Sequence, residues 1–176
     1  VKNHKLGSKI PLRTLVKYSI IYSDNSAHQM IISYIGRNNL KEFGKSLGAI
    51  NTLNGSDNFG HTSAADGLIY MKKLNEFFEN NGELGRELKG YFLDSLQNEL
   101  SVNNLKVANK YGMYKKYYHN MGIIYDEHPY VISIMTLEGY NDKETVINDI
   151  SQKIYDLHNS FYENRKNTCN LEIYGQ

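Results

Sequence analysis

Apolar side chains in the N-terminal half of the chain recur every three to four residues, with polar side chains between them. Such spacing places the apolar residues on one face of a helix. It predicts helices over 11–21, 30–35, 40–47 and 82–100. Pro11 suits a first helical turn and Gly36 closes the second helix. The polar residues at 22–26 separate the first two helices and offer N-cap side chains to the second.

A long stretch at 48–61 is rich in Gly, Asn, Ser and Asp and lacks apolar periodicity, which predicts a loop. Ser63 and Asp66 then stand at the spacing of a capping box, in which the acidic side chain reaches back to the backbone N–H of the cap residue. Behind them, apolar residues continue at helical spacing to Phe78. The loop is therefore expected to run directly into a further helix.

The hydrophobic pattern changes in the second half of the chain, where the period falls towards two. Segments rich in Tyr, Ile, Val and Met, separated by short polar links, predict a three-stranded antiparallel meander over 108–114, 118–125 and 130–136. From Asn141 the helical period returns, with an apolar face made of Val146, Ile147, Ile150, Ile154, Leu157 and Phe161. The order of helices, strands and a final helix predicts an α+β fold.

Composition and length indicate a single domain over residues 1–176. The chain has no internal repeat or low-complexity linker, and 40% of its residues are hydrophobic, enough to bury one sizeable core. Its net charge of +1 predicts no nucleic-acid partner, and no apolar run reaches the length of a membrane span. The lone Cys169 offers no internal disulfide. His61, His119 and His128 lack metal-ligand spacing with carboxylates, so we expect no metal and no cofactor.

Two short motifs carry candidate chemistry. Ser23-Asp24-Asn25 lies in the break between the first two helices, where a hydroxyl and an amide can face a cleft. Ser56-Asp57-Asn58 repeats the triplet inside the long loop, so an ordinary turn is the competing interpretation. Lys110-Tyr111-Gly112 lies on the first predicted strand, where a lysine also serves to protect an edge strand from pairing. Each motif alone is a weak signal.

The order of the two motifs resembles the family of serine β-lactamases and penicillin-binding proteins. In that family a Ser-Asp-Asn loop precedes a Lys-Thr-Gly strand, which two more strands and a C-terminal helix follow. Flanking segments are similar to the family's helix end, helix start and strand series, at 20–27, 62–66, 110–125 and 129–132. The resemblance covers roughly residues 10–160. It implies a β-lactamase/transpeptidase-like fold with a helical region, an antiparallel sheet and a C-terminal helix.

The resemblance also implies a role for each motif residue. Ser23 would relay a proton towards the leaving nitrogen of the substrate, and Asn25 would orient the substrate amide and the active-site lysine. Lys110 would place positive charge near Ser23 and the substrate carboxylate, while Tyr111 and Gly112 would line the edge of the substrate. The implied partner is a β-lactam or a D-Ala-D-Ala-type peptidoglycan peptide, and the implied location is extracytoplasmic.

Three departures from the family pattern bear on activity. No serine is followed three residues later by lysine, so the nucleophilic Ser-x-x-Lys is absent, and we expect the N-terminal strands and the nucleophile helix to lie upstream of Val1. Ile50 stands where class A enzymes hold the glutamate that activates the deacylating water, and it cannot accept a proton. Tyr111 replaces the threonine of Lys-Thr-Gly. These departures favour slow acyl-enzyme chemistry or none.

Two other interpretations stay open on the sequence alone. A catalytically silent relative would use the same groove to bind wall peptide or a protein partner, which the changes at Ile50 and Tyr111 allow. A soluble α/β domain with accidental motif matches is the other. If upstream strands are missing, the open strand edge would favour a homodimer or an exchange of segments between chains.

Overall fold

The structure is a computed structural model that describes the chain apart from residues 2–3, 54–59, 101, 138–141 and 175–176. For residue 143 and residues 167–174 it describes the backbone alone. The second Ser-Asp-Asn triplet and the side chain of Cys169 therefore lie outside the described parts of the chain.

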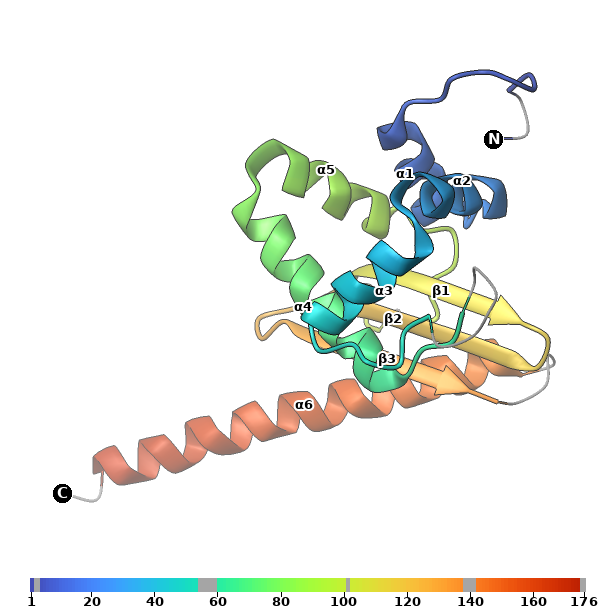
Figure 1. Cartoon of the computed structure of the whole chain (residues 1–176). Coiled ribbons are helices and arrows are strands. Elements are labelled where there is room, and N and C mark those ends of the chain that lie inside the picture. The colour runs from blue at the N-terminus through green and yellow to red at the C-terminus, as the bar shows by residue number, and fades with distance from the viewer. Residues whose placement is uncertain (2–3, 54–59, 101, 138–141, 175–176) are drawn as a thin grey trace.

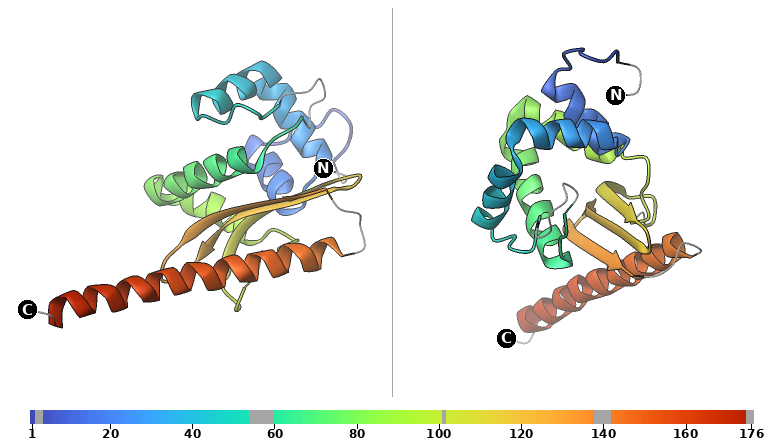
Figure 2. Two further views of the ribbon diagram at one scale, coloured as in Figure 1. Left: turned by 90° about the horizontal axis from the view of Figure 1, so that it is seen from below. Right: turned by 45° about the vertical axis from the view of Figure 1, so that its right-hand side comes forward.

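The described residues form helices, then an antiparallel sheet, then one long helix. In chain order the elements are α1 (Leu12–Ile21), α2 (Asn25–Ile35), α3 (Arg37–Ser46), α4 (Ala64–Asn80), α5 (Gly82–Leu93), β1 (Lys106–Tyr114), β2 (Tyr117–Tyr125), β3 (Tyr130–Thr136) and α6 (Lys143–Tyr174). This order confirms the predicted α+β fold. Figure 1 shows α4 and α5 on one face of the sheet and α6 across the other, and the two views in Figure 2 agree.

The sheet is an antiparallel meander in the order β1-β2-β3. The register pairs Lys110 with Met121 and Gly112 with His119. A tight turn at 115–116 joins β1 to β2, with Lys115 in the left-handed region at φ 53°. Lys115 and Lys116 of this turn are both exposed. Within the described residues β1 and β3 are edge strands, and association through an open edge stays a prediction.

Because side chains alternate along a strand, each face of the sheet has its own apolar cluster. The cluster towards α4 and α5 contains Met71, Phe78, Phe92, Ala108 and Ile123. The cluster towards α6 contains Leu100, Val102, Val107, Tyr118, Ile124, Ile132, Ile134 and Ile147. Two consecutive residues of β1 therefore face different surroundings, and this alternation decides where the polar residues of β1 point.

The helix predicted over 82–100 is too long at its C-terminal end, because α5 stops at Leu93. The backbone N–H of Ser95 bonds the carbonyl of Phe92, and that of Leu96 donates to the carbonyl of Ile21 at the end of α1, 3.2 Å away. This contact with a distant element takes the chain out of the helical path. The segment that follows runs back to the sheet and reaches its α6 face.

The predicted apolar face of the last helix is also wrong. Ile147 is buried and Ile154 packs on the α6-face cluster, but four of the six expected residues are exposed: Val146, Ile150, Leu157 and Phe161. Ser151 is fully buried instead and donates from Oγ to the carbonyl of Leu100. The buried face of α6 is rotated relative to the predicted apolar face, because side chains of intermediate polarity, including His158 and Tyr162, cover the end of the sheet.

Candidate functional site

The break between α1 and α2 holds Ser23 in an unusual backbone conformation. Asp24 is the N-cap of α2, and its carboxylate accepts a hydrogen bond from the backbone N–H of Ala27 at 2.8 Å. The backbone N–H of Asp24 donates to the carbonyl of Tyr18 at 3.2 Å. Between these anchors Ser23 has φ 50°, in the left-handed region that non-glycine residues seldom occupy. The turn thus directs the serine out of the path of both helices.

Lys110 of β1 reaches across to this turn. Its Nζ donates to Ser23 Oγ, which joins the two sequence motifs, and it also donates to the carbonyl of Tyr111 at 2.9 Å. Nζ lies 4.3 Å from the centre of the Tyr111 ring, within the range of a cation–π contact. Among the described residues no carboxylate forms an ion pair with Lys110.

Burial lowers the pKa of Lys110 to about 8. Removal of an ammonium from water disfavours its charged form, and a nearby carboxylate would offset that effect. With no such carboxylate in the described part of the chain, Lys110 is a positive charge in a partly dehydrated place and can exchange a proton near pH 8. An anionic ligand next to Nζ would therefore gain more than it would at a solvated lysine.

The other motif residues lie around this pair in different ways. Asn25 is exposed in the first turn of α2, and none of the hydrogen bonds found among the described residues links it to Ser23 or Lys110. The Tyr111 ring packs against the cluster on the α6 face. A Cβ built at Gly112 meets no atom of the described residues within 4 Å, so among these residues the position borders open space. Ser23, Lys110 and Gly112 thus come together, with the Tyr111 ring beside Lys110 Nζ, whereas Asn25 stands apart.

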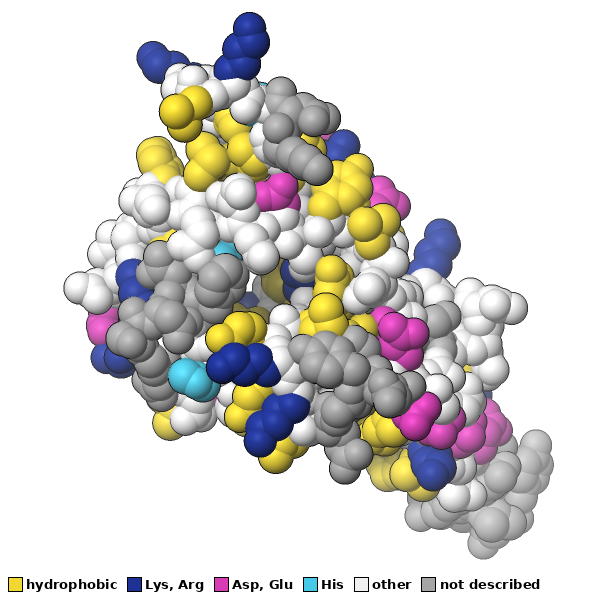
Figure 3. Space-filling view, turned by 90° about the vertical axis from the view of Figure 1, so that its right-hand side faces the viewer, with side chains coloured by type: hydrophobic (Ala, Val, Ile, Leu, Met, Phe, Trp, Pro, Cys, Tyr) yellow, Lys and Arg dark blue, Asp and Glu magenta, His cyan; other side chains and the backbone are white. Residues whose placement is uncertain are grey.

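The face of the molecule towards the β1–β2 turn is hollowed near its centre. Figure 3 shows Lys and Arg side chains and hydrophobic side chains around the hollow, with a basic side chain visible at its depth. The helical part lies above the hollow and the sheet below it, as a comparison with Figure 1 shows. An elongated ligand could therefore lie along the sheet at this end.

A buried carboxylate, that of the capping-box residue Asp66, fixes the segment before α4. Asp66 is 1% exposed and accepts hydrogen bonds from the backbone N–H of Asn51 at 2.9 Å, from Thr52 Oγ1 at 2.8 Å and from Ser63 Oγ at 3.1 Å. Ser63 caps α4 as predicted, by accepting from the N–H of Asp66. Asp66 instead turns to the loop, while Ile50 beside it is 66% exposed.

A second polar cluster lies on the α6 face, directly behind Lys110. Asn109 is fully buried and donates from Nδ2 to the carbonyl of Gln97 at 2.5 Å and to Asn120 Oδ1 at 3.1 Å. Asn120 donates onward to Glu99 at 2.6 Å, and the Tyr118 hydroxyl donates to the same carboxylate. Burial, with the nearby Glu99, raises the pKa of Tyr118 well above its usual value.

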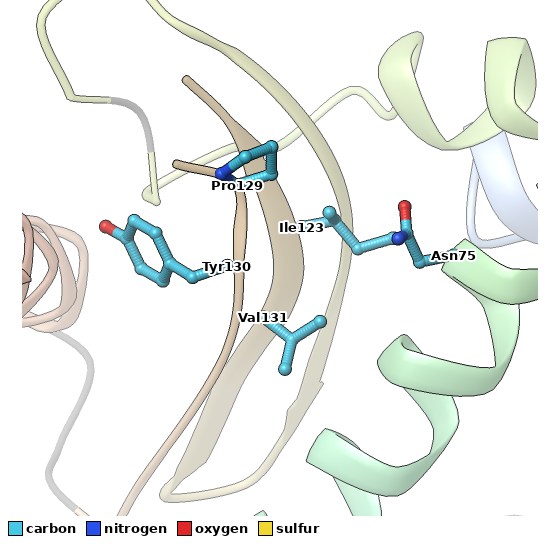
Figure 4. A pocket seen from close by; sticks show the side chains of 5 residues that line it. All are labelled: Asn75, Ile123, Pro129, Tyr130 and Val131. Carbon is cyan, nitrogen blue, oxygen red and sulfur yellow. The ribbon is translucent and has the colours of Figure 1, made fainter. Parts of the chain in front are cut away.

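A pocket of about 360 Å³ opens between α4 and the β2–β3 end of the sheet. Its lining is mainly apolar, and Figure 4 shows Ile123 and Val131 pointing towards Asn75 of α4, while the Tyr130 ring points away towards α6. The amide of Asn75 accepts from the Tyr125 hydroxyl at 3.4 Å. The pocket lacks a group that could perform acid–base or nucleophilic chemistry.

In the described part of the chain, no three His, Cys, Asp or Glu residues lie close enough together to hold a metal ion. A search of the same residues for a helix long and apolar enough to cross a membrane also finds none.

Comparisons with known proteins bear on the fold and the family. Among solved structures the chain is similar to PBP-A, with a TM-score of 0.78 and 22% identity over 89% of this chain and 64% of that one. A mutant of PBP-A in an acyl-enzyme complex with penicillin G gives a TM-score of 0.77 at 22% identity, over 90% and 66%. A class A β-lactamase from Mycobacterium abscessus gives 0.74 at 15% identity, over 90% and 69%.

At these identities the similarity shows the fold, and the chain spans 64% to 66% of the length of the two PBP-A structures. No curated protein matches the chain. The profile of the Beta-lactamase2 family, described as the β-lactamase enzyme family, matches residues 1–158, which is most of the chain. The chain therefore belongs to the β-lactamase enzyme family and has the fold of class A β-lactamases and PBP-A.

Proposed function

We propose that the chain forms the Ser23–Lys110 side of a serine acyl-transfer site for β-lactams or D-Ala-D-Ala-type peptides of the cell wall. The hydrogen bond from Lys110 Nζ to Ser23 Oγ carries this proposal, because it joins residues 87 positions apart in the order that the family resemblance implies. The fold shared with PBP-A, one of whose structures is an acyl-enzyme complex with penicillin G, supports it. Such substrates would place the protein outside the cytoplasmic membrane.

Acyl transfer from an amide requires a proton for the nitrogen that leaves when the C–N bond breaks. In the proposed mechanism Ser23 Oγ–H gives that proton, and the Lys110 ammonium, already a donor to Oγ, replaces it. Lys110 is then neutral until it regains a proton from solvent. Its pKa of about 8 suits this role, because the ammonium releases a proton near neutral pH more readily than an ordinary lysine.

Lys110 has a second proposed role in the recognition of the substrate. β-Lactams of the penicillin type and peptides that end in D-Ala both carry a carboxylate near the reacting amide. A positive charge without a carboxylate partner among the described residues, half-buried on β1, offers that group an ion pair in a site of reduced dielectric constant. The open position at Gly112 leaves room for the ligand beside it.

The proposal extends to what happens after acylation. The 176 residues contain no Ser-x-x-Lys, so formation of the ester needs a nucleophile from outside this sequence. The family resemblance puts Ile50 at the place of the deacylating glutamate, and an isoleucine cannot activate a water, so we propose slow release of the acyl group or none. The same two features favour the alternative of a catalytically silent relative that binds wall peptide in this groove.

The test is ligand binding to the 176-residue chain, followed by amide NMR. Penicillin G and N-acetyl-D-Ala-D-Ala should each shift the amide resonances of Ser23, Lys110 and Gly112. Lys110→Ala should abolish these shifts, whereas Lys106→Ala, at the exposed start of the same strand, should leave them unchanged. An absence of shifts with both ligands would show the proposal to be wrong.

An experiment on a longer polypeptide that includes a Ser-x-x-Lys segment distinguishes an enzyme from a protein that only binds the ligand. Mass spectrometry after incubation with penicillin G should show a covalent adduct if the site performs acyl transfer. Reversible binding without an adduct would support the silent relative.

A further inference from the structure

Lys89 of α5 and Lys110 of β1 are both half-buried, but they differ in their partners. Lys89 Nζ lies 3.0 Å from Glu79 Oε1 and 3.9 Å from the centre of the Tyr125 ring. Burial alone would lower the pKa of Lys89, but Glu79 and Tyr125 together raise it above its usual value. Lys110 forms no ion pair with a carboxylate of the described residues, and burial lowers its pKa to about 8. Near pH 8 the Lys110 amine is therefore partly uncharged, whereas Lys89 stays an ammonium.

The groups that face Lys110 Nζ do not hold a proton on it. Ser23 Oγ on the turn between α1 and α2 and the carbonyl oxygen of Tyr111 on β1 accept hydrogen bonds from Nζ, and both are uncharged. The carboxylate of Asp24, next to Ser23, is engaged by the N-terminal ammonium of Val1 at 2.6 Å. Each contact of Nζ is thus compatible with a neutral amine.

The same two acceptors orient the neutral amine. An uncharged lysine has two N–H donors and one lone pair, and the oxygens of Ser23 and Tyr111 can accept both hydrogens. The tetrahedral geometry of the nitrogen then directs the lone pair away from these two oxygens. A lone pair in that orientation is available to an electrophile that enters from the side of the ligand.

Space for such an electrophile lies along β1. Gly112 is two residues beyond Lys110 and therefore on the same face of the strand. A Cβ built at Gly112 meets no atom of the described residues within 4 Å, whereas at Gly122 a Cβ would lie 2.9 Å from the carbonyl oxygen of Ala108. The face that Figure 3 shows is hollowed at this end of the sheet. A small ligand can therefore approach the Lys110 amine.

We infer that Lys110 is itself a nucleophile: its neutral amine opens the ring of a β-lactam bound in the hollow and becomes acylated through an amide. A desolvated lysine in a pocket is a recognised way to activate an amine for covalent chemistry. The inference rests on the proposed function only for the binding of a β-lactam beside Ser23 and Lys110. It requires no Ser-x-x-Lys.

The reaction balances within the two molecules. The lone pair of Nζ forms a bond to the lactam carbonyl carbon, and the C–N bond of the ring breaks with its electron pair left on the ring nitrogen. Nζ becomes positively charged on attack and gives a proton to Ser23 Oγ, while the Ser23 hydroxyl gives its own proton to the ring nitrogen. The product is an amide of Lys110 and a secondary amine, and neither oxidant nor water is consumed.

Ring strain separates this reaction from ordinary peptide binding. The four-membered ring of a β-lactam releases strain when it opens, whereas an unstrained peptide bond offers no such release. N-acetyl-D-Ala-D-Ala should therefore bind without forming an adduct. An amide is also far more stable to hydrolysis than a serine ester, so acylation of Lys110 would close the hollow permanently.

The experiment incubates the 176-residue chain with penicillin G at pH 8 and locates adducts by mass spectrometry of tryptic peptides. At this pH about half of Lys110 is uncharged, against about 1 in 300 of an ordinary lysine. Because nucleophilicity falls with basicity, we expect Lys110 to be labelled about tenfold faster than the exposed Lys106 and Lys115. Lys89 should be labelled no faster than these two.

Three further measurements identify the nucleophile. The labelling rate at Lys110 should rise as pH increases through about 8, because only the uncharged amine attacks. Hydroxylamine, which cleaves esters, should leave the adduct intact. Lys110→Arg should remove this adduct without change in the labelling of Lys106. With p-nitrophenyl acetate, which needs no specific binding, Glu79→Gln should increase the labelling of Lys89 several-fold, because its carboxylate partner is lost.

The outcomes separate this inference from the proposed function. If penicillin G shifts the amide resonances of Ser23, Lys110 and Gly112 but labels Lys110 no faster than Lys106, the inference is overturned and the proposed function stands. A hydroxylamine-sensitive adduct on Ser23 in place of the lysine amide would also overturn it. If penicillin G causes neither shifts nor labelling, and N-acetyl-D-Ala-D-Ala causes no shifts, both fail.

Discussion

Asn109 and Lys110 are neighbours on β1, yet the two faces of the sheet use their polarity in opposite ways. The Asn109 amide is fully buried and joined to Gln97 and Asn120. The Lys110 ammonium is half-buried, faces Ser23 and finds no carboxylate among the described residues. Hydrogen bonds from a buried amide hold its strand to neighbouring segments, although Asn109 Oδ1 finds no partner in the described part of the chain, whereas a charge without a counterion there is available to a ligand.

Removal of Asn120 should disrupt the buried hydrogen-bonded cluster around Asn109 and should lower the stability of the fold more than any other change predicted here. Asn120→Ala removes the acceptor of Asn109 and the donor to Glu99, and it leaves both partners in a buried site. The free energy of unfolding should fall by about 3 kcal/mol, as measured by urea denaturation. Asn38→Ala, at an exposed position of α3, is the matched control and should cost less than about 1 kcal/mol.

Lys110→Met should have the opposite effect on stability to Asn120→Ala: it should weaken ligand binding and raise the free energy of unfolding. Affinity for N-acetyl-D-Ala-D-Ala should fall about 30-fold, as expected for loss of a charge-assisted bond. Because burial lowers the pKa of Lys110 in the folded chain, the ammonium destabilises the fold at pH 7, and methionine should raise the free energy of unfolding by about 1–2 kcal/mol. A loss of stability as large as that of Asn120→Ala would contradict the comparison.

The pH dependence of binding sharpens the same point. Lys110 attracts a carboxylate only when protonated, so affinity for N-acetyl-D-Ala-D-Ala should decline as pH rises through about 8, the pKa of the free chain. A bound carboxylate raises that pKa, so the affinity continues to decline until the pH passes the higher pKa of the complex. Lys110→Arg should bind with a flat profile over this range, because arginine stays charged. A flat profile in the wild type would show that Lys110 does not hold the carboxylate.

The smallest expected effect concerns the turn that carries Ser23. At φ 50° a side chain strains the backbone, so Ser23→Gly should be more stable than Ser23→Ala by about 1 kcal/mol. Thermal unfolding of the two variants measures this difference. Both variants lack the hydroxyl and should fail equally in any proton relay. Equal stability would mean that the conformation of the turn is relaxed in solution.

The sequence predicted well whatever depends on local pattern. The three strands, the cap at Ser63 and the helix preceding Gly36 follow from side-chain period and from residues that suit helix ends. The approach of Ser23 to Lys110 was expected from the family resemblance alone, because no local rule connects residues so far apart along the chain. The structure brings this pair together and leaves Asn25 exposed beside it.

The sequence missed what depends on contacts between distant segments. Glu99 and Asn120 are ordinary polar residues until the segment after α5 returns to the sheet. The capping-box spacing predicts that the Asp66 carboxylate reaches back to the backbone N–H of Ser63, whereas the carboxylate accepts from the backbone N–H of Asn51 in the loop. The buried face of α6 was predicted from hydrophobicity alone, but the surface that it meets also accepts Ser151.

Gly112 also bears on how this protein can diverge from its relatives. A Cβ there meets no atom of the described residues within 4 Å, and no positive φ requires a glycine, so a larger side chain should reduce the room for the proposed ligand at little cost to folding. At Gly122 any substitution forces the strands to shift. Under the proposed function, variation at position 112 would thus alter the range of ligands in single mutational steps, while the scaffold stays the same.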